Sequence, residues 1–83
     1  MTRTDIENEI RTILTRVTHQ DVAEVGPEDD LIDAIGIDSL GRLEVLSEIE
    51  EAFDITIYDL DADKIATIRG IRDVVEAAML EPV

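Results

Sequence analysis

The sequence predicts an all-α fold, a small four-helix up-down bundle with a long loop between helices 1 and 2 and a short third helix. The chain has 83 residues, of which 45% are hydrophobic and only 2% aromatic. One core must therefore be built from aliphatic side chains, which suits packed helices. Apolar residues recur every three or four positions in two long stretches, as on one face of a helix. The β-prone residues 55–58 are too isolated to form a sheet.

The two long helices are expected over residues 3–18 and 39–53. Acidic residues crowd the first turns of residues 3–18, where negative charge suits the helix dipole. Asp38 is a favourable N-cap for the second long helix and places Ser39 in its first turn, where several backbone N–H groups have no intrahelical partner. The apolar stripe predicted for residues 39–53 is Leu40, Leu43, Leu46, Ile49 and Phe53, with Val45 on its flank.

Shorter elements fill the rest of the chain. Residues 19–38 contain glycines, a proline and a cluster of acids, and predict a loop that folds back over the bundle with a helical turn at 28–35. A short helix is expected around residues 59–65. Residues 67–70 are expected to turn the chain into a final helix over residues 71–80.

Charge and composition narrow the class of partner. The net charge is −14, from 21 acidic and 7 basic residues, so nucleic acid and membrane surfaces are poor partners and basic protein surfaces are good ones. No cysteine is present, which excludes disulfides and thiolate metal sites. The acidic N-terminus is not a signal peptide and no apolar run is long enough to span a membrane. We expect a cytoplasmic, monomeric, free-standing module.

Ser39 is the one candidate nucleophile that its context singles out. A hydrolase nucleophile elbow needs glycines two residues before and two after the serine, but this chain has Gly36 three before and Gly41 two after. The single histidine, His19, would have to act as the base, and the chain is too short for the sheet that supports such an elbow. A hydrolase is therefore rejected, and the plain alternative is an ordinary first-turn serine.

A metal site is also not expected. Asp59, Asp61 and Asp63 alternate like the first ligands of a calcium-binding EF-hand loop, but Lys64 stands where the loop needs glycine and Gly70 where it needs glutamate. His19, alone at the end of a predicted helix, is interpreted as a partial helix cap rather than a ligand.

Three stretches resemble the acyl carrier protein family, which includes the aminoacyl and peptidyl carrier domains. They are GIDSL at residues 36–40, LEVLSEIEEAFDITI at 43–57 and IATIRGIRDVV at 65–75. In that family a serine in a Gly-x-Asp-Ser-Leu motif, at the start of the second helix, carries a phosphopantetheine arm. The resemblance covers nearly the whole chain and is far more specific than Asp-Ser-Leu alone.

The resemblance implies a single acyl carrier domain over residues 1–83, with 4'-phosphopantetheine attached to Ser39. It implies a carrier that is not an enzyme. A phosphopantetheinyl transferase attaches the arm from coenzyme A, and the arm's thiol then holds acyl groups as thioesters. Asp38 would assist this modification, and Leu40 would contact partner enzymes. The other partners implied are acyl-loading and acyl-processing enzymes with basic docking surfaces.

The second long helix is also the expected partner surface. Glu44, Glu48 and Glu51 are predicted to face solvent near the serine and to steer basic partners, with fast encounter and easy release. The chain departs from many fatty-acid carriers in having Gly41 and Arg42 after the Ser-Leu pair. Glycine inside a helix costs about 1 kcal/mol relative to alanine, and Arg42 places positive charge inside the acidic interface.

Several functions stay open on the sequence. Within the carrier class these are a carrier of fatty-acid synthesis, a specialised carrier for polyketide or lipid synthesis, and an aminoacyl or peptidyl carrier for a dedicated ligase. Peptidyl carriers more often have histidine before the serine, so Asp38 argues mildly against them. Outside the class stands an acidic helical interaction module with no covalent arm, in which Ser39→Ala would change nothing.

Overall fold

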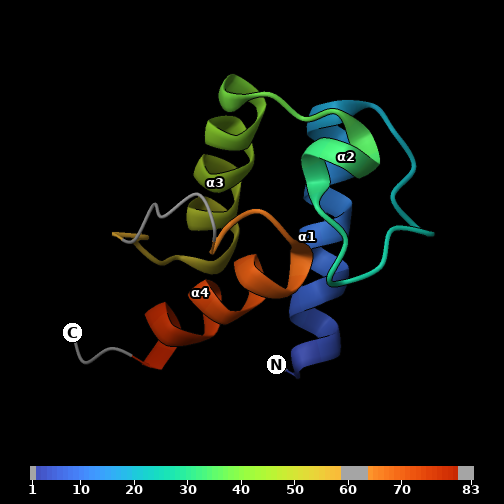
Figure 1. Cartoon of the computed structure of the whole chain (residues 1–83). Helices are drawn as coiled ribbons and strands as arrows, with labels where there is room; N and C mark the ends of the chain where they lie inside the picture. The colour runs from blue at the N-terminus through green and yellow to red at the C-terminus, as the bar shows by residue number, and fades with distance from the viewer. Residues whose placement is uncertain (1, 59–63, 81–83) are drawn as a thin grey trace.

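The computed structural model describes residues 2–58 and 64–80, and these form a small all-α bundle. Its helices are α1 (Arg3–Thr18), α2 (Leu31–Ile35), α3 (Ser39–Phe53) and α4 (Ile68–Leu80). Figure 1 shows α1 and α3 running in opposite directions, with α4 below α3 and running obliquely away from the N-terminal half of α1. The described ranges contain no strand, and the all-α prediction is confirmed. In the same ranges, no helix combines the length and the apolar character needed to cross a membrane.

Local capping fixes both ends of α1. The Thr2 hydroxyl accepts a hydrogen bond from the Asp5 N–H, and the Asp5 carboxylate accepts one from the Thr2 N–H, both at 3.1 Å. His19 ends the helix in a left-handed conformation with φ of 59°, and its N–H donates to the Thr15 carbonyl at 2.8 Å. His19 therefore occupies the capping position that the sequence predicted for it.

The long loop between α1 and α3 belongs to the core. Arg11 of α1 donates from one guanidinium nitrogen to the carbonyl oxygens of Val22 and Val25, each at 2.7 Å. The Leu31 N–H donates to the Ala66 carbonyl at 2.9 Å, which joins the loop to the segment before α4. The loop supplies four of the buried hydrophobic side chains, which are Val22, Leu31, Ile35 and Ile37.

The apolar stripe predicted for α3 is wrong at its first turns. Leu40 and Leu43 are 65% and 57% exposed, whereas Val45, expected on the flank, is only 1% exposed. Successive helical residues are separated by about 100°, so Val45 and Ile49 share one side while Leu40 lies on the opposite side. The helices and loop packed against α3 select the Val45 side. Leu46 and Ile49 are buried as predicted, and Phe53 is partly buried.

The shorter elements also differ from expectation. Helix α2 begins at Leu31 rather than at residue 28, because the Asp30 carboxylate caps it by accepting from the Ile32 N–H at 2.8 Å. Most of the short helix predicted at 59–65 lies outside the described residues, and Lys64 and Ile65 form a turn. The Ile55–Tyr58 stretch is irregular, and the Ile57 N–H donates to the Glu50 carboxylate at 2.9 Å.

The final helix begins at Ile68, three residues before the predicted start. The Thr67 hydroxyl accepts from the Gly70 N–H at 2.9 Å, and the Thr67 carbonyl accepts from the Ile71 N–H at 3.0 Å. These bonds draw residues 68–70, predicted as a turn, into the first helical turn. A Cβ at Gly70 would lie 1.8 Å from the Lys64 carbonyl oxygen, so the close approach of the two backbones requires glycine.

Candidate functional site

The candidate site lies where the chain leaves α2 and enters α3. Gly36 ends α2 with a positive φ of 64°, a conformation that side chains disfavour, and its N–H donates to the Ile32 carbonyl at 2.9 Å. Ile37 is buried and anchors the connection in the core. Asp38 then takes an extended conformation as the N-cap of α3, and Ser39 is the first helical residue. The whole motif is thus a fixed turn between two capped helices.

Asp38 is held by the backbone of the helix that it caps. Its Oδ1 atom accepts from the Gly41 N–H at 2.6 Å, and its carbonyl accepts from the Arg42 N–H at 2.9 Å. A Cβ at Gly41 would lie 3.1 Å from both Asp38 Oδ1 and Ile37 Cγ1. Glycine at position 41 therefore lets the cap and the buried isoleucine close tightly over the first turn.

Ser39 is exposed, and its hydroxyl has no hydrogen-bond partner within residues 2–58 and 64–80. The N–H groups of Ser39 and Leu40 lie in the first turn, where helix geometry provides no acceptor. The positive end of the helix dipole coincides with these groups, so a negatively charged substituent on the serine oxygen would be favoured. The chemistry available here is attachment of an anionic group to an accessible hydroxyl.

The acidic surface of α3 that was expected to contact partners is only partly free of ion pairs within the molecule. Glu44 and Glu51 are exposed on α3, as predicted. Glu48 is half-buried and pairs with Arg16 of α1, whose Nε atom lies 2.8 Å from Glu48 Oε1. This differs from the open, solvent-facing position expected from the sequence, because α1 brings a cation to that side of α3. The exposed Leu40 and Leu43 add apolar surface beside the serine.

Arg42 occupies a different side of α3 from the acidic residues. It is half-buried and, together with Val45 and Leu46, lines a small void between α3 and residues 65–71. The void measures about 10 Å³, and its other walls are aliphatic. Arg42 is thus the single polar residue in that lining. We call this boundary between α3 and residues 65–71 the seam. With a void of this size, the seam is closed.

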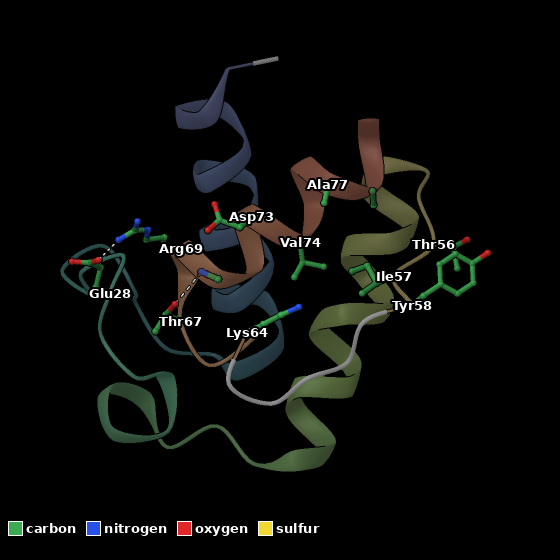
Figure 2. A pocket seen from close by; sticks show the side chains of 12 residues that line it. Glu28, Thr56, Ile57, Tyr58, Lys64, Thr67, Arg69, Asp73, Val74 and Ala77 are labelled. Carbon is green, nitrogen blue, oxygen red and sulfur yellow. Dashed lines mark hydrogen bonds and ion pairs between the residues drawn. The ribbon is translucent and has the colours of Figure 1, made fainter. Parts of the chain in front are cut away.

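A large hollow lies away from Ser39. It measures about 690 Å³ and lies between the end of the 56–58 segment and α4, with Ile57 and Val74 among its apolar walls. Figure 2 shows this hollow, with Arg69 and Glu28 paired at one edge and Tyr58 at the other. No residue of the turn into α3 lines it. The exposed Ser39 lies next to a smaller, open hollow of about 290 Å³, whose lining includes Asp38, Leu40 and Gly41.

No cluster of three or more metal-ligating side chains occurs in the described parts of the chain. Asp59, Asp61 and Asp63, the residues weighed as the start of a calcium loop, lie outside them.

Sequence reasoning missed two supports of the site. Gln20 donates from its side-chain amide to the Ile35 carbonyl at 2.8 Å, tying the end of α1 to the end of α2. The signal was too weak to find, since one polar residue in a loop has no periodic pattern. The second is the close packing of Gly41 on Ile37, which depends on the direction in which the chain enters α3.

Comparison with known proteins agrees with this geometry. Residues 8–75 match the family described as phosphopantetheine attachment site, which covers well over half of the chain and includes the turn into α3. That family match means that the cofactor of this chain is covalently attached 4'-phosphopantetheine. The exposed, unpartnered hydroxyl at the start of α3 fits such a group.

Individual relatives point the same way. An acyl carrier protein of Exiguobacterium sp. is 33% identical over 79 residues, covering 95% of this chain and 100% of the relative. One from Desulforapulum autotrophicum is 39% identical over 64 residues, covering 76% of this chain and 83% of the relative. One from Streptomyces coelicolor is 34% identical over 76 residues, covering 90% and 83%. The chain belongs to the acyl carrier protein family.

Proposed function

We propose that this chain is a single acyl carrier domain, residues 1–83, in which Ser39 carries the phosphopantetheine arm. The observation that carries the proposal is the exposed Ser39 hydroxyl, without a partner in the described residues, at the first position of α3 and inside the matched family region. The other serine of that helix, Ser47, is also exposed but lies two turns further along, away from the free N–H groups.

The modification needs a transferase and coenzyme A. Ser39 Oγ would form a bond to the phosphorus next to the pantetheine of coenzyme A, the pyrophosphate bond would break so that adenosine bisphosphate leaves, and the hydroxyl proton would pass to a base of the transferase. The resulting phosphodiester would lie beside the free N–H groups of the first turn. Asp38 supports this step in the proposal. Its Oδ1 is engaged by the Gly41 N–H, which holds the carboxylate next to Ser39 and leaves Oδ2 for the transferase or its metal.

The protein itself is proposed to be non-catalytic and cytoplasmic. The thiol at the end of the arm holds acyl groups as thioesters and presents them to loading and processing enzymes. That thiol supplies the sulfur that a chain without cysteine lacks. The pathway class is fatty-acid, polyketide or specialised lipid synthesis.

Partner enzymes are proposed to dock on the exposed side of α3. Leu40 offers an apolar contact, and Glu44 and Glu51 offer charges that attract a basic surface. Glu48 contributes less free charge because Arg16 pairs with it. Glu44→Lys should slow acyl transfer to a basic-faced partner several-fold and flatten its salt dependence, with Glu24→Lys, a loop residue, as the charge-matched control. Equal transfer by the two variants would remove Glu44 from the docking surface.

Sheltering of cargo inside the bundle is a further part of the proposal. The seam between α3 and residues 65–71 is aliphatic apart from Arg42, but its void of about 10 Å³ is too small for an acyl chain. A sheltered chain therefore requires the elements on either side to move apart. Thioester hydrolysis rates that fall as the acyl chain lengthens would support this, and rates independent of length would contradict it.

Intact mass spectrometry tests the central proposal. The unmodified protein is incubated with coenzyme A and a broad-specificity phosphopantetheinyl transferase, with Ser39→Ala and Ser47→Ala as matched variants. A gain of one phosphopantetheinyl group in the wild type and in Ser47→Ala, but not in Ser39→Ala, is the expected result. No gain in a folded wild-type sample would leave the acidic interaction module as the better interpretation.

A second assay separates the pathways. The protein that carries the phosphopantetheine arm, but no acyl group, is offered malonyl groups by a malonyl transferase and aminoacyl groups by adenylating ligases. Acceptance of malonyl groups supports fatty-acid or polyketide synthesis, whereas selective aminoacylation would favour an aminoacyl or peptidyl carrier.

A further inference from the structure

Arg42 differs from every other arginine of the chain. The others have partners: Arg3 and Arg72 pair with acids on α1 and α4, Arg16 with Glu48, Arg69 with Glu28, and Arg11 with two loop carbonyls. Arg42 has no hydrogen-bonding or ion-pairing side-chain partner in the described residues. In a chain with a net charge of −14, an arginine without a carboxylate partner calls for an explanation.

The neighbours of Arg42 explain why it is unpaired. Asp38, one turn before it, turns its carboxylate to the Gly41 N–H. Glu44 is two residues away and therefore on another side of the helix. The void that Arg42 lines is otherwise aliphatic, with Ile65 and Ile71 across the seam. Arg42 thus borders apolar side chains, while its guanidinium has no anionic partner within residues 2–58 and 64–80.

We propose that Arg42 is a positioning residue that binds the phosphodiester of the arm on Ser39 and directs the arm along the seam between α3 and residues 65–71. The inference rests on the proposed attachment at Ser39. Residues three apart on a helix are neighbours, with Cβ atoms about 5–6 Å apart. Helical side chains also lean toward the N-terminus, which brings the guanidinium of residue 42 toward the turn that holds Ser39.

A phosphodiester suits Arg42 better than an anion in solution does. Because it is bonded to Ser39, pairing is intramolecular and no translational freedom is lost when the ion pair forms. The planar guanidinium can donate two parallel hydrogen bonds to phosphate oxygens, which an ammonium group cannot. The arm would then leave the serine on the Arg42 side of α3, toward the aliphatic seam and away from the exposed Leu40.

Nuclear magnetic resonance of the loaded protein tests this. Two signals are followed, the phosphorus resonance of the arm and the Nε–Hε resonance of Arg42. We expect loading to shift the Arg42 signal, and Arg42→Gln to move the phosphorus resonance to the position of the free diester and abolish its salt dependence. Arg42→Lys should give an intermediate position. Arg3→Gln removes a charge from the first residue of α1 and should change neither signal, because the start of α1 lies at the opposite end of the bundle from the start of α3 (Figure 1).

Three results would overturn the proposal. One is an Arg42 signal identical before and after loading, which needs no variant to fold. Another is a phosphorus resonance unchanged by Arg42→Gln. The third is an Arg42 shift that appears only when the arm bears a malonyl group, since that would assign the guanidinium to a cargo carboxylate. Mass spectrometry of each sample reports the arm itself, so failure of attachment at Ser39 is distinguished from failure of the Arg42 contact.

Discussion

Helices α3 and α4 begin with the same capping arrangement and use it differently. In each, the residue before the helix accepts a hydrogen bond from the N–H of a glycine three residues on, Asp38 from Gly41 at 2.6 Å and Thr67 from Gly70 at 2.9 Å. At the start of α3 the first helical residue, Ser39, is exposed. At the start of α4 the corresponding residue, Ile68, is fully buried.

The difference shows that a capped helix start becomes a site only when tertiary packing leaves it open. The start of α4 is closed by the backbone at Lys64 and by the loop, since the Arg69 N–H donates to the Pro27 carbonyl at 2.8 Å. The start of α3 borders the connection from α2 and, across an open hollow of about 290 Å³, the end of α1 at Val17 and Thr18, and Ser39 stays exposed. The start of α4 contributes to stability, whereas the start of α3 leaves a hydroxyl and free N–H groups accessible.

The largest expected effect comes from adding a side chain at Gly70, in the closely packed first turn of α4. Gly70→Ala should destabilise the protein by about 3 kcal/mol, because the added methyl group would overlap the Lys64 carbonyl and the backbone would have to move. Urea unfolding followed by circular dichroism measures this. A loss below about 1 kcal/mol would mean that the approach of the two backbones is easily relaxed, and the contrast between the two helix starts would weaken.

Removing the cap side chains separates stability from function. Asp38→Ala and Thr67→Ala should each cost about 1 kcal/mol, because each leaves a first-turn N–H without its acceptor. Only Asp38→Ala should also slow attachment of the arm, several-fold or more. Equal loading rates for the two variants, measured by mass spectrometry over time, would limit Asp38 to a capping role.

Gly41→Ala should have a smaller effect on stability than Gly70→Ala. Alanine gains about 1 kcal/mol of helix propensity over glycine, but its Cβ would press on Asp38 Oδ1 and Ile37 Cγ1 at 3.1 Å. These two contributions should nearly cancel, leaving the free energy of unfolding within about 1 kcal/mol of the wild type. Urea unfolding beside Gly70→Ala provides the direct comparison. A loss as large as that of Gly70→Ala would show that the open start is packed as rigidly as the closed one.

The smallest effect concerns a third helix start, that of α1. Hydrogen bonds from the Thr2 backbone and hydroxyl lower the pKa of Asp5 from its ordinary value of 3.8. A lowered folded-state pKa means that this contribution to stability is present above about pH 3.8 and is lost as the pH falls through the folded-state value. The melting temperature of Asp5→Ala should therefore lie slightly below that of the wild type at neutral pH and converge with it in acid. Thr4→Ala, which removes no charge, is the control, and a difference that stays constant with pH would contradict the prediction.

The sequence by itself determined the helices whose signals are local. Residues 3–18 and 39–53 were predicted with the bounds that the structure has, because apolar periodicity and capping residues act over a few positions. The Gly-x-Asp-Ser-Leu motif likewise locates the turn into α3. The start of α4 was predicted three residues late, since Thr67 and Gly70 resemble turn residues when the close packing on Lys64 is not known.

Only the tertiary structure decided which side of each helix is buried and which charges are free. Leu40 and Leu43 fit an apolar stripe as well as Val45 does, and the position of the neighbouring helices exposes the first two and buries the third. Glu48 is paired because α1 brings Arg16 to it, whereas Arg42 has no side-chain partner among the described residues and borders aliphatic residues of a distant segment. Burial and pairing depend on contacts between residues far apart in the chain, and periodicity within one helix does not contain that information.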